Sequence, residues 1–146
     1  MSVSLRTLCL SIVTLLVCAT PSLAHTRSQS SSHWQVQGDT LQGRVQADAL
    51  DVTRLYVLGG EAALEETFRA HVAESFVVAT SDGVCAAGEP KLAPAAPGRV
   101  AVTLSFDCPG GALRGGAVDL KSTLFLQVAA THLHFVSVTR ADGAEA

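Results

Sequence analysis

Three histidines occupy positions that suit the binding of a transition metal. His132 and His134 are two residues apart in a predicted strand, so both imidazoles should point to the same face. His25 would be the first residue after removal of an export signal, and its free amine and imidazole can together chelate Cu(II) or Ni(II). In the plainer interpretation, His132 and His134 only pack across neighbouring strands, and His25 is an ordinary N-terminal residue. The residues by themselves leave both interpretations open.

The cysteines favour a disulfide over a metal or redox site. Cys9 and Cys18 lie in the apolar N-terminal segment, which leaves Cys85 and Cys108 as an even pair. The pair lacks the C-x-x-C spacing of redox and zinc sites, and exported proteins meet an oxidising compartment. We therefore predict one Cys85–Cys108 disulfide, which would stabilise the fold by about 3 kcal/mol through loop closure.

Patterns typical of enzymes are weak in this chain. Serine and histidine are frequent, but no G-x-S-x-G elbow is present. The neighbouring carboxylates of Glu65 and Glu66 lie on the polar side of a predicted helix, which indicates a solvated face. His33 and His71 flank apolar positions and are interpreted as partly buried structural histidines. We therefore predict a non-enzymatic protein.

The N-terminus has the layout of a cleaved secretory signal peptide. Arg6 precedes an apolar run over residues 8–19, and Ser22-Leu23-Ala24 offers small residues at a cleavage site. The expected organisation is a signal peptide over 1–24, one domain over 25–140 and a disordered tail over 141–146. A periplasmic or extracellular location follows. No later apolar stretch is long enough to span a membrane, so we expect no span after processing.

The charge of the chain argues against nucleic acid as a partner. The whole chain has a formal net charge of −3, and Arg6 is the only charged residue before Ala24. The processed protein would therefore carry −4 without any basic run, whereas nucleic-acid-binding proteins present a basic patch.

Hydrophobic patterning predicts a mainly β fold. A polar, serine-rich segment over 25–32 leads into alternating apolar and polar residues, which indicate strands. The spacing of Leu64, Phe68 and Val72 predicts one amphipathic helix over 61–74, with Glu65 and Arg69 able to pair. The fold class that results is an Ig-like β-sandwich of about seven strands with one helix. The predicted strands are 34–36, 41–48, 76–80, 84–86, 100–108, 118–128 and 133–139, with a Pro/Ala linker over 90–98.

Several short stretches resemble a known family. They are the segment 24–30 with Trp34 close behind, 51–55, 82–85, 106–108 and 131–135. This pattern is similar to the extracytoplasmic N-terminal domain of HupE/UreJ-like bacterial membrane proteins. In that family the domain precedes a multi-helix membrane region related to nickel permeases. The chain departs from the pattern because it stops near the point where those helices would begin.

The resemblance implies a partner in the membrane. We expect an exported accessory or sensing domain that works with a membrane protein, one that resembles a metal permease. The first alternative is a periplasmic Cu- or Ni-binding protein that uses His25, His132 and His134. The second alternative is an exported enzyme of unknown type, which no sequence motif supports.

Overall fold

The computed structural model describes residues 28–58, 62–114 and 117–140. The predicted signal peptide, His25 and the predicted tail over 141–146 lie outside these ranges. Two β-sheets and two α-helices make up the described part, which confirms the mainly β, sandwich-like fold class.

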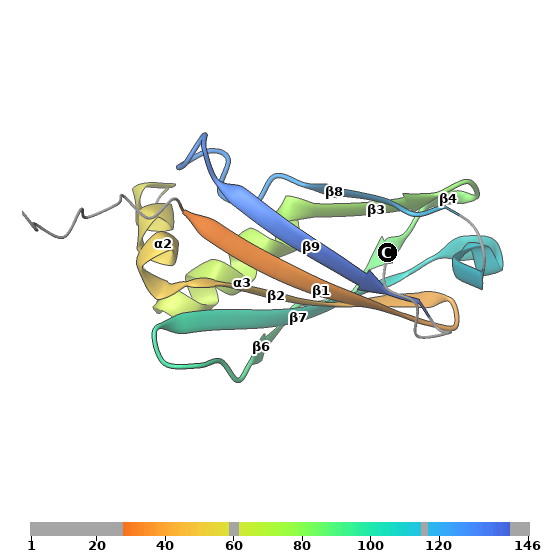
Figure 1. Cartoon of the computed structure of the whole chain (residues 1–146), viewed down its shortest axis with the longest axis horizontal. Coiled ribbons are helices and arrows are strands. Elements are labelled where there is room, and N and C mark those ends of the chain that lie inside the picture. The colour runs from red at the N-terminus through yellow and green to blue at the C-terminus, as the bar shows by residue number, and fades with distance from the viewer. Residues whose placement is uncertain (1–27, 59–61, 115–116, 141–146) are drawn as a thin grey trace, which may run out of the picture.

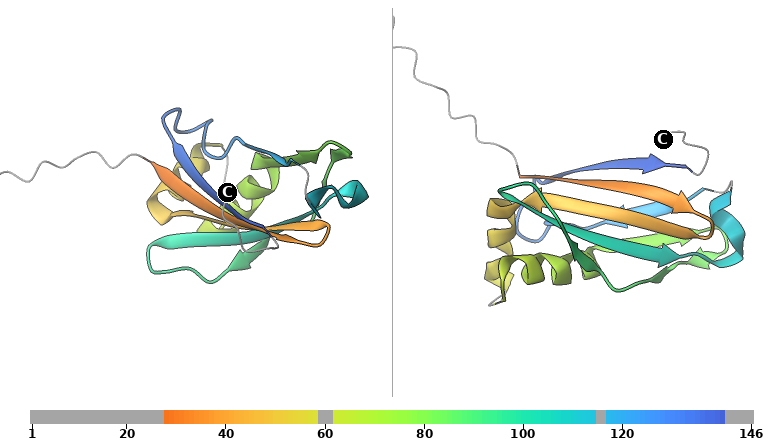
Figure 2. Two further views of the ribbon diagram at one scale, coloured as in Figure 1. Left: turned by 45° about the vertical axis from the view of Figure 1, so that its right-hand side comes forward. Right: turned by 90° about the horizontal axis from the view of Figure 1, so that it is seen from below.

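The larger sheet is built around two long hairpin strands (Figures 1 and 2). Its strand order is β5-β7-β2-β1-β9, with β6 also paired to β7. All neighbours are antiparallel except β1 and β9, which run parallel. The strands are β1 (Gln29–Gln37), β2 (Thr40–Asp48), β5 (Ala86–Ala87), β6 (Lys91–Ala93), β7 (Arg99–Asp107) and β9 (Leu133–Thr139).

The smaller sheet and the helices cover part of the larger sheet (Figure 2). The smaller sheet has the order β4-β3-β8. Its strands are β3 (Phe76–Thr80), β4 (Gly83–Val84) and β8 (Asp119–Ser122), and the helices are α2 (Ala49–Thr53), α3 (Leu64–Ser75) and the 3-10 helices η1 (Arg54–Leu58) and η2 (Pro109–Arg114). None of the helices in the described residues is long and apolar enough to cross a bilayer.

The core forms where the apolar faces of both sheets meet the helix. Trp34 on β1 is fully buried and contacts the rings of Phe76 and Phe106, at centroid distances of 5.4 and 6.0 Å. Helix α3 adds Phe68 and Val72 to this cluster, as its spacing predicted.

One glycine is required by the packing of the tryptophan. Gly43 on β2 lies opposite Trp34, and a Cβ atom there would be 2.3 Å from the indole carbon Cζ3. Only a residue without a side chain leaves room for the indole at this position.

The disulfide is confirmed and connects the two sheets. Cys85 lies between β4 of the smaller sheet and β5 of the larger one, and Cys108 directly follows β7. Their Cα atoms are 4.2 Å apart. The bond therefore holds the point where the chain crosses from one sheet to the other.

Several boundaries differ from the predicted ones. The predicted linker over 90–98 contains β6, and the predicted strand over 118–128 is a strand only at β8. After β8 the chain turns at Phe125, whose φ of 62° is incompatible with a continuing strand. Strand β1 begins at Gln29, five residues before the predicted start.

The helical regions also depart from expectation. Helix α2 and η1 follow β2 directly, because Asp48 caps the first turn by accepting a hydrogen bond from the N–H of Leu50. Within α3, Arg69 pairs with Glu66 at 2.7 Å, so the predicted pair with Glu65 was wrong.

Candidate functional site

Two of the three predicted metal ligands lie together, in a continuous chain of hydrogen bonds between β1 and β9. The Nδ1 atom of His132 is hydrogen-bonded to the Ser28 hydroxyl, and its Nε2 atom is hydrogen-bonded to the Ser30 hydroxyl, both at 2.7 Å. His134 is bonded in the same way to Ser30 at 2.6 Å and to Ser32 at 2.8 Å. We call these five residues the serine–histidine ladder.

The parallel pairing of the first and last strands creates the ladder. Alternate residues of β1 point inward, which places Ser30 and Ser32 on the core side in addition to Trp34. The register sets Ser30 beside His134, so the imidazole inserts between two successive inward serines. His132 lies just before β9, whose bounds are those of the predicted strand over 133–139, yet its side chain lies on the same side as that of His134.

The ladder has a consistent arrangement of protons. The indole N–H of Trp34 can only donate, and it donates to the Ser32 hydroxyl at 2.8 Å. Ser32 can then donate to Nε2 of His134, whose Nδ1–H donates to Ser30. Ser30 in turn donates to Nε2 of His132, and every polar atom has a partner. This arrangement requires both imidazoles to be neutral.

The electrostatic environment keeps the imidazoles neutral. Burial, together with charge repulsion from the neighbouring His132, lowers the pKa of His134 to about 4. Burial also lowers the pKa of His132, although the Asp51 carboxylate acts in the opposite direction. Both side chains are therefore uncharged at neutral pH.

The geometry bears directly on the predicted metal site. His132 and His134 are neutral and adjacent, as metal ligands must be, but all four ring nitrogens are hydrogen-bonded to serine. A metal ion would have to replace at least one of these bonds. Within the described ranges, no group of three or more His, Cys, Asp or Glu side chains is arranged to hold a metal. His25 lies outside those ranges.

The hydroxyls of Ser30 and Ser32 share only one feature with the nucleophile of a catalytic Ser–His pair, namely their distance from a histidine nitrogen. Ser30 lies within the range at which a histidine activates a serine. Ser30 is only 2% exposed, however, and Ser32 is 3% exposed. A substrate carbonyl therefore cannot reach either hydroxyl in this conformation.

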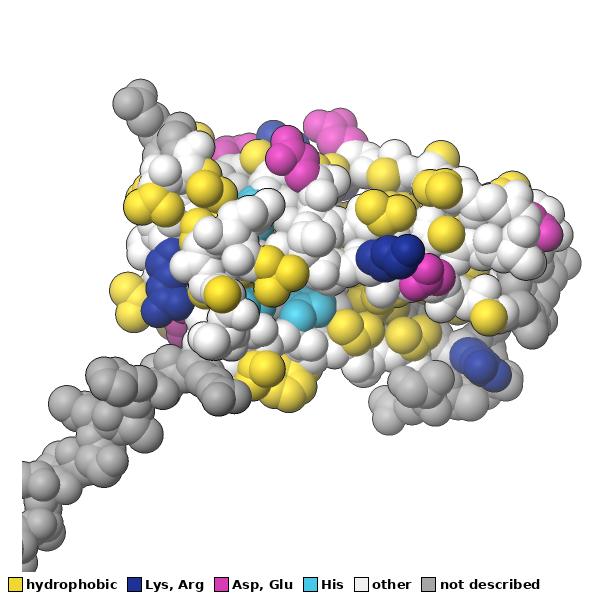
Figure 3. Space-filling model, turned by 90° about the horizontal axis from the view of Figure 1, so that it is seen from above, with side chains coloured by type: hydrophobic (Ala, Val, Ile, Leu, Met, Phe, Trp, Pro, Cys, Tyr) yellow, Lys and Arg dark blue, Asp and Glu magenta, His cyan; other side chains and the backbone are white. Residues whose placement is uncertain are grey.

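The strand that carries His134 is open to solvent. In the described part of the chain β9 pairs only with β1, so its second edge is unpaired. Phe135 on its outer face is 56% exposed, and Val136 on its inner face is 46% exposed. Figure 3 shows histidine side chains at the surface on this side, among hydrophobic ones. We call β9 with its unpaired edge the open edge.

A third histidine supports the turn that leads into β9. Nε2 of His71 accepts a hydrogen bond from the backbone N–H of Phe125 at 3.1 Å. The buried ring of Phe125 lies between Phe68 and His132, with centroid distances of 6.1 and 4.7 Å. His71 is thus a partly buried structural histidine, as predicted. The same prediction was wrong for His33, which is exposed.

Comparison with models of known protein families found no match, and comparison with curated protein sequences found none either.

Proposed function

We propose that the chain is an exported, non-enzymatic accessory or sensing domain that binds a membrane-located partner through its open edge. The observation that carries the proposal is the state of β9. Its seven residues include no Lys, Arg, Asp or Glu, and one edge and parts of both faces are exposed.

An edge of this kind is unusual in a protein that works alone. Exposed edges are normally protected by charges, proline or bulges, because their free N–H and C=O groups attract other strands. Strand β9 has none of these devices and presents Leu133 and Phe135 on one face. A partner that adds a strand here would satisfy the backbone groups and cover the apolar side chains.

The resemblance to HupE/UreJ-like domains suggests where the partner resides. In that family the extracytoplasmic domain stands next to a membrane region. A partner with an extended segment outside the bilayer would fit both the resemblance and the open edge.

Site-specific photo-crosslinking in the natural host tests the proposal. A photoreactive residue at position 135 should crosslink to one integral membrane protein. The matched control is position 77 on β3, because Val77 is also exposed, at 49%, but lies on the smaller sheet. Equal crosslinking from both positions, or none from position 135, would contradict the proposal.

The alternative function, a Cu(II) or Ni(II) carrier, is supported by one observation. His132 and His134 are side by side in the neutral form that binds metals. His25 would supply the third ligand.

A further inference from the structure

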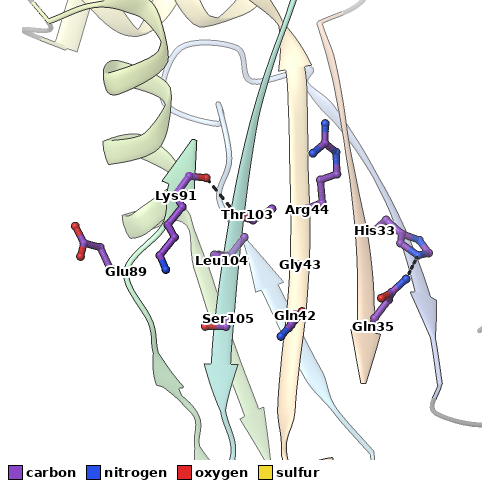
Figure 4. A pocket seen from close by; sticks show the side chains of 10 residues that line it. All are labelled: His33, Gln35, Gln42, Gly43, Arg44, Glu89, Lys91, Thr103, Leu104 and Ser105. Carbon is purple, nitrogen blue, oxygen red and sulfur yellow. Dashed lines mark hydrogen bonds between the residues drawn. The ribbon is translucent and has the colours of Figure 1, made fainter. Parts of the chain in front are cut away.

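The outer face of the larger sheet carries an ordered row of basic side chains. The strand registers place His33 of β1 beside Arg44 of β2, Arg44 beside Thr103 of β7, and Thr103 beside Lys91 of β6. Figure 4 shows these side chains as one band across four strands. The row therefore follows from strand pairing and does not depend on a mobile loop.

A second row supplies neutral polar groups next to the first. Gln35, Gln42 and Ser105 are aligned across β1, β2 and β7 by the same registers. Together the rows line a groove of about 310 Å³, which we call the polar groove (Figure 4). A volume of this size lies at the lower end of the range for small-molecule sites.

The cations of the polar groove have no carboxylate partners. Among the described residues, neither Arg44 nor Lys91 is within ion-pair distance of an Asp or Glu, whereas Arg54, Arg69 and Lys121 each are. The one carboxylate on the lining is that of Glu89, which is 83% exposed and lies 3.9 Å from Arg69. With Arg44 and Lys91 against Glu89, the lining carries a net charge of about +1, whereas the whole chain has a net charge of −3.

Two of the donors are held in place. Arg44 donates from Nη2 to the carbonyl oxygen of Pro94, which leaves its other N–H groups for a ligand. The amide of Gln35 bonds to Nε2 of His33 at 3.4 Å. Preorganised donors of this kind lower the entropy cost of binding.

We propose that the polar groove binds an acidic saccharide, that is, a hydroxylated sugar with carboxylate or phosphate groups. Arg44 and Lys91 are two strands apart, about 10 Å at strand spacing, which suits a ligand with two separated anionic groups. The amides and hydroxyls both donate and accept, as sugar hydroxyls require. The polar groove shares no residue with β9, so either proposal can fail without the other.

Titration calorimetry on the processed protein at pH 7 and low salt tests the inference. The probes are trigalacturonate for carboxylate, fructose 1,6-bisphosphate for phosphate, and maltotriose as the neutral control. We expect one acidic probe to bind and maltotriose not to bind. Arg44→Gln and Lys91→Gln should each weaken binding about tenfold, the size of a lost charge-assisted hydrogen bond.

The controls separate a specific site from general charge. Lys121→Gln removes a cation that pairs with Asp119 on the smaller sheet, and it should leave affinity unchanged. Glu89→Gln should strengthen binding, because it removes the carboxylate from the lining. The inference is overturned if neither acidic probe saturates below about 10 mM, which corresponds to negligible affinity. It is also overturned if Lys121→Gln weakens binding as much as Arg44→Gln.

Discussion

The hydroxyl of Ser30 lies 2.6 Å from Nδ1 of His134, and this bond connects strands that are 104 residues apart in the chain. Ser30 also bonds to His132. One hydroxyl thus satisfies a buried imidazole, that of His132, and a partly buried one, that of His134. The attachment of β9 to β1 therefore depends on these side-chain hydrogen bonds as well as on backbone pairing.

Replacing Ser30 should be costly. The Ser30→Ala variant leaves one nitrogen of each imidazole without a partner, and an unsatisfied buried polar group costs about 1–3 kcal/mol. We expect the free energy of unfolding to fall by about 2–4 kcal/mol. Ser31→Ala on the outer face is the matched control, since Ser31 makes one 3.2 Å bond with Gln46. Urea denaturation measures both, and equal effects would argue against the ladder.

Acid should weaken the fold through the ladder. In the unfolded chain the pKa of His134 is the ordinary histidine value of 6.5, whereas in the folded protein its pKa is lowered to about 4. Between these values the unfolded state binds more protons, so stability should fall as pH drops from about 7 to about 4 and be flat above 7. The loss from His134 amounts to at most about 3 kcal/mol.

Urea denaturation at pH 7.5, 6 and 4.5 measures this dependence. His132 and His71 shift in the same direction and add to the slope. His134→Gln keeps a polar side chain but removes one titrating group, so its slope should be smaller than that of the wild type. An unchanged slope would show that His134 does not contribute.

The disulfide should be complete and stabilising. Because Cys85 and Cys108 connect the two sheets, we expect neither to be a free thiol in protein purified without a reductant. Cys85→Ala should lower the free energy of unfolding by about 2–4 kcal/mol. Thiol titration under native and denaturing conditions checks the first point, and urea denaturation the second. Two titratable thiols in the denatured, unreduced protein would contradict the prediction.

The contact between Gly43 and Trp34 predicts a severe effect from a single methyl group. Gly43→Ala would place its Cβ 2.3 Å from the indole, so the ring or β2 must move. Overpacking of this kind typically costs about 1–3 kcal/mol. Tryptophan fluorescence should shift, because Trp34 is the single tryptophan and is fully buried. Gly98→Ala strains the backbone because φ is +78° there, but its Cβ would meet no atom within 4 Å, so the fluorescence of the folded protein should be unchanged.

The metal-carrier alternative makes a distinct prediction. Protein that begins at His25 should bind Cu(II) or Ni(II) tighter than millimolar, and an added N-terminal residue should abolish the amine ligand. His132→Ala and His134→Ala should weaken binding, while the exposed His33→Gln should not. Affinity should fall as the pH is lowered, because protons compete with the metal ion for the ligating nitrogens. Calorimetry measures each. If blocking the N-terminus leaves the affinity for the metal unchanged, this function is excluded.

A substitution of His71 would not be a suitable control in the metal-binding experiment, although His71 is not one of the predicted ligands. Its Nε2 holds the backbone of Phe125, whose ring packs against His132. A His71 variant would therefore disturb the ladder indirectly.

The local patterns of the sequence were enough to predict most elements of the fold. Alternation along β2 and β7 and the four-residue spacing of Phe68 and Val72 reflect which side chains each element must bury, so they are visible without tertiary structure. The Cys85–Cys108 pair was predictable because only two cysteines follow the N-terminal segment.

The tertiary structure alone decided what the chemically active residues do. The shared face of His132 and His134 was evident from their spacing, but their serine partners lie about a hundred residues away, and only the parallel pairing of β9 with β1 brings them together. The alternation of Ser28, Ser30 and Ser32 was the available signal, and it was hidden because serine is polar and does not mark a buried face. Burial of hydroxyls is possible here because histidines satisfy them, a condition set by strand order and not by local sequence.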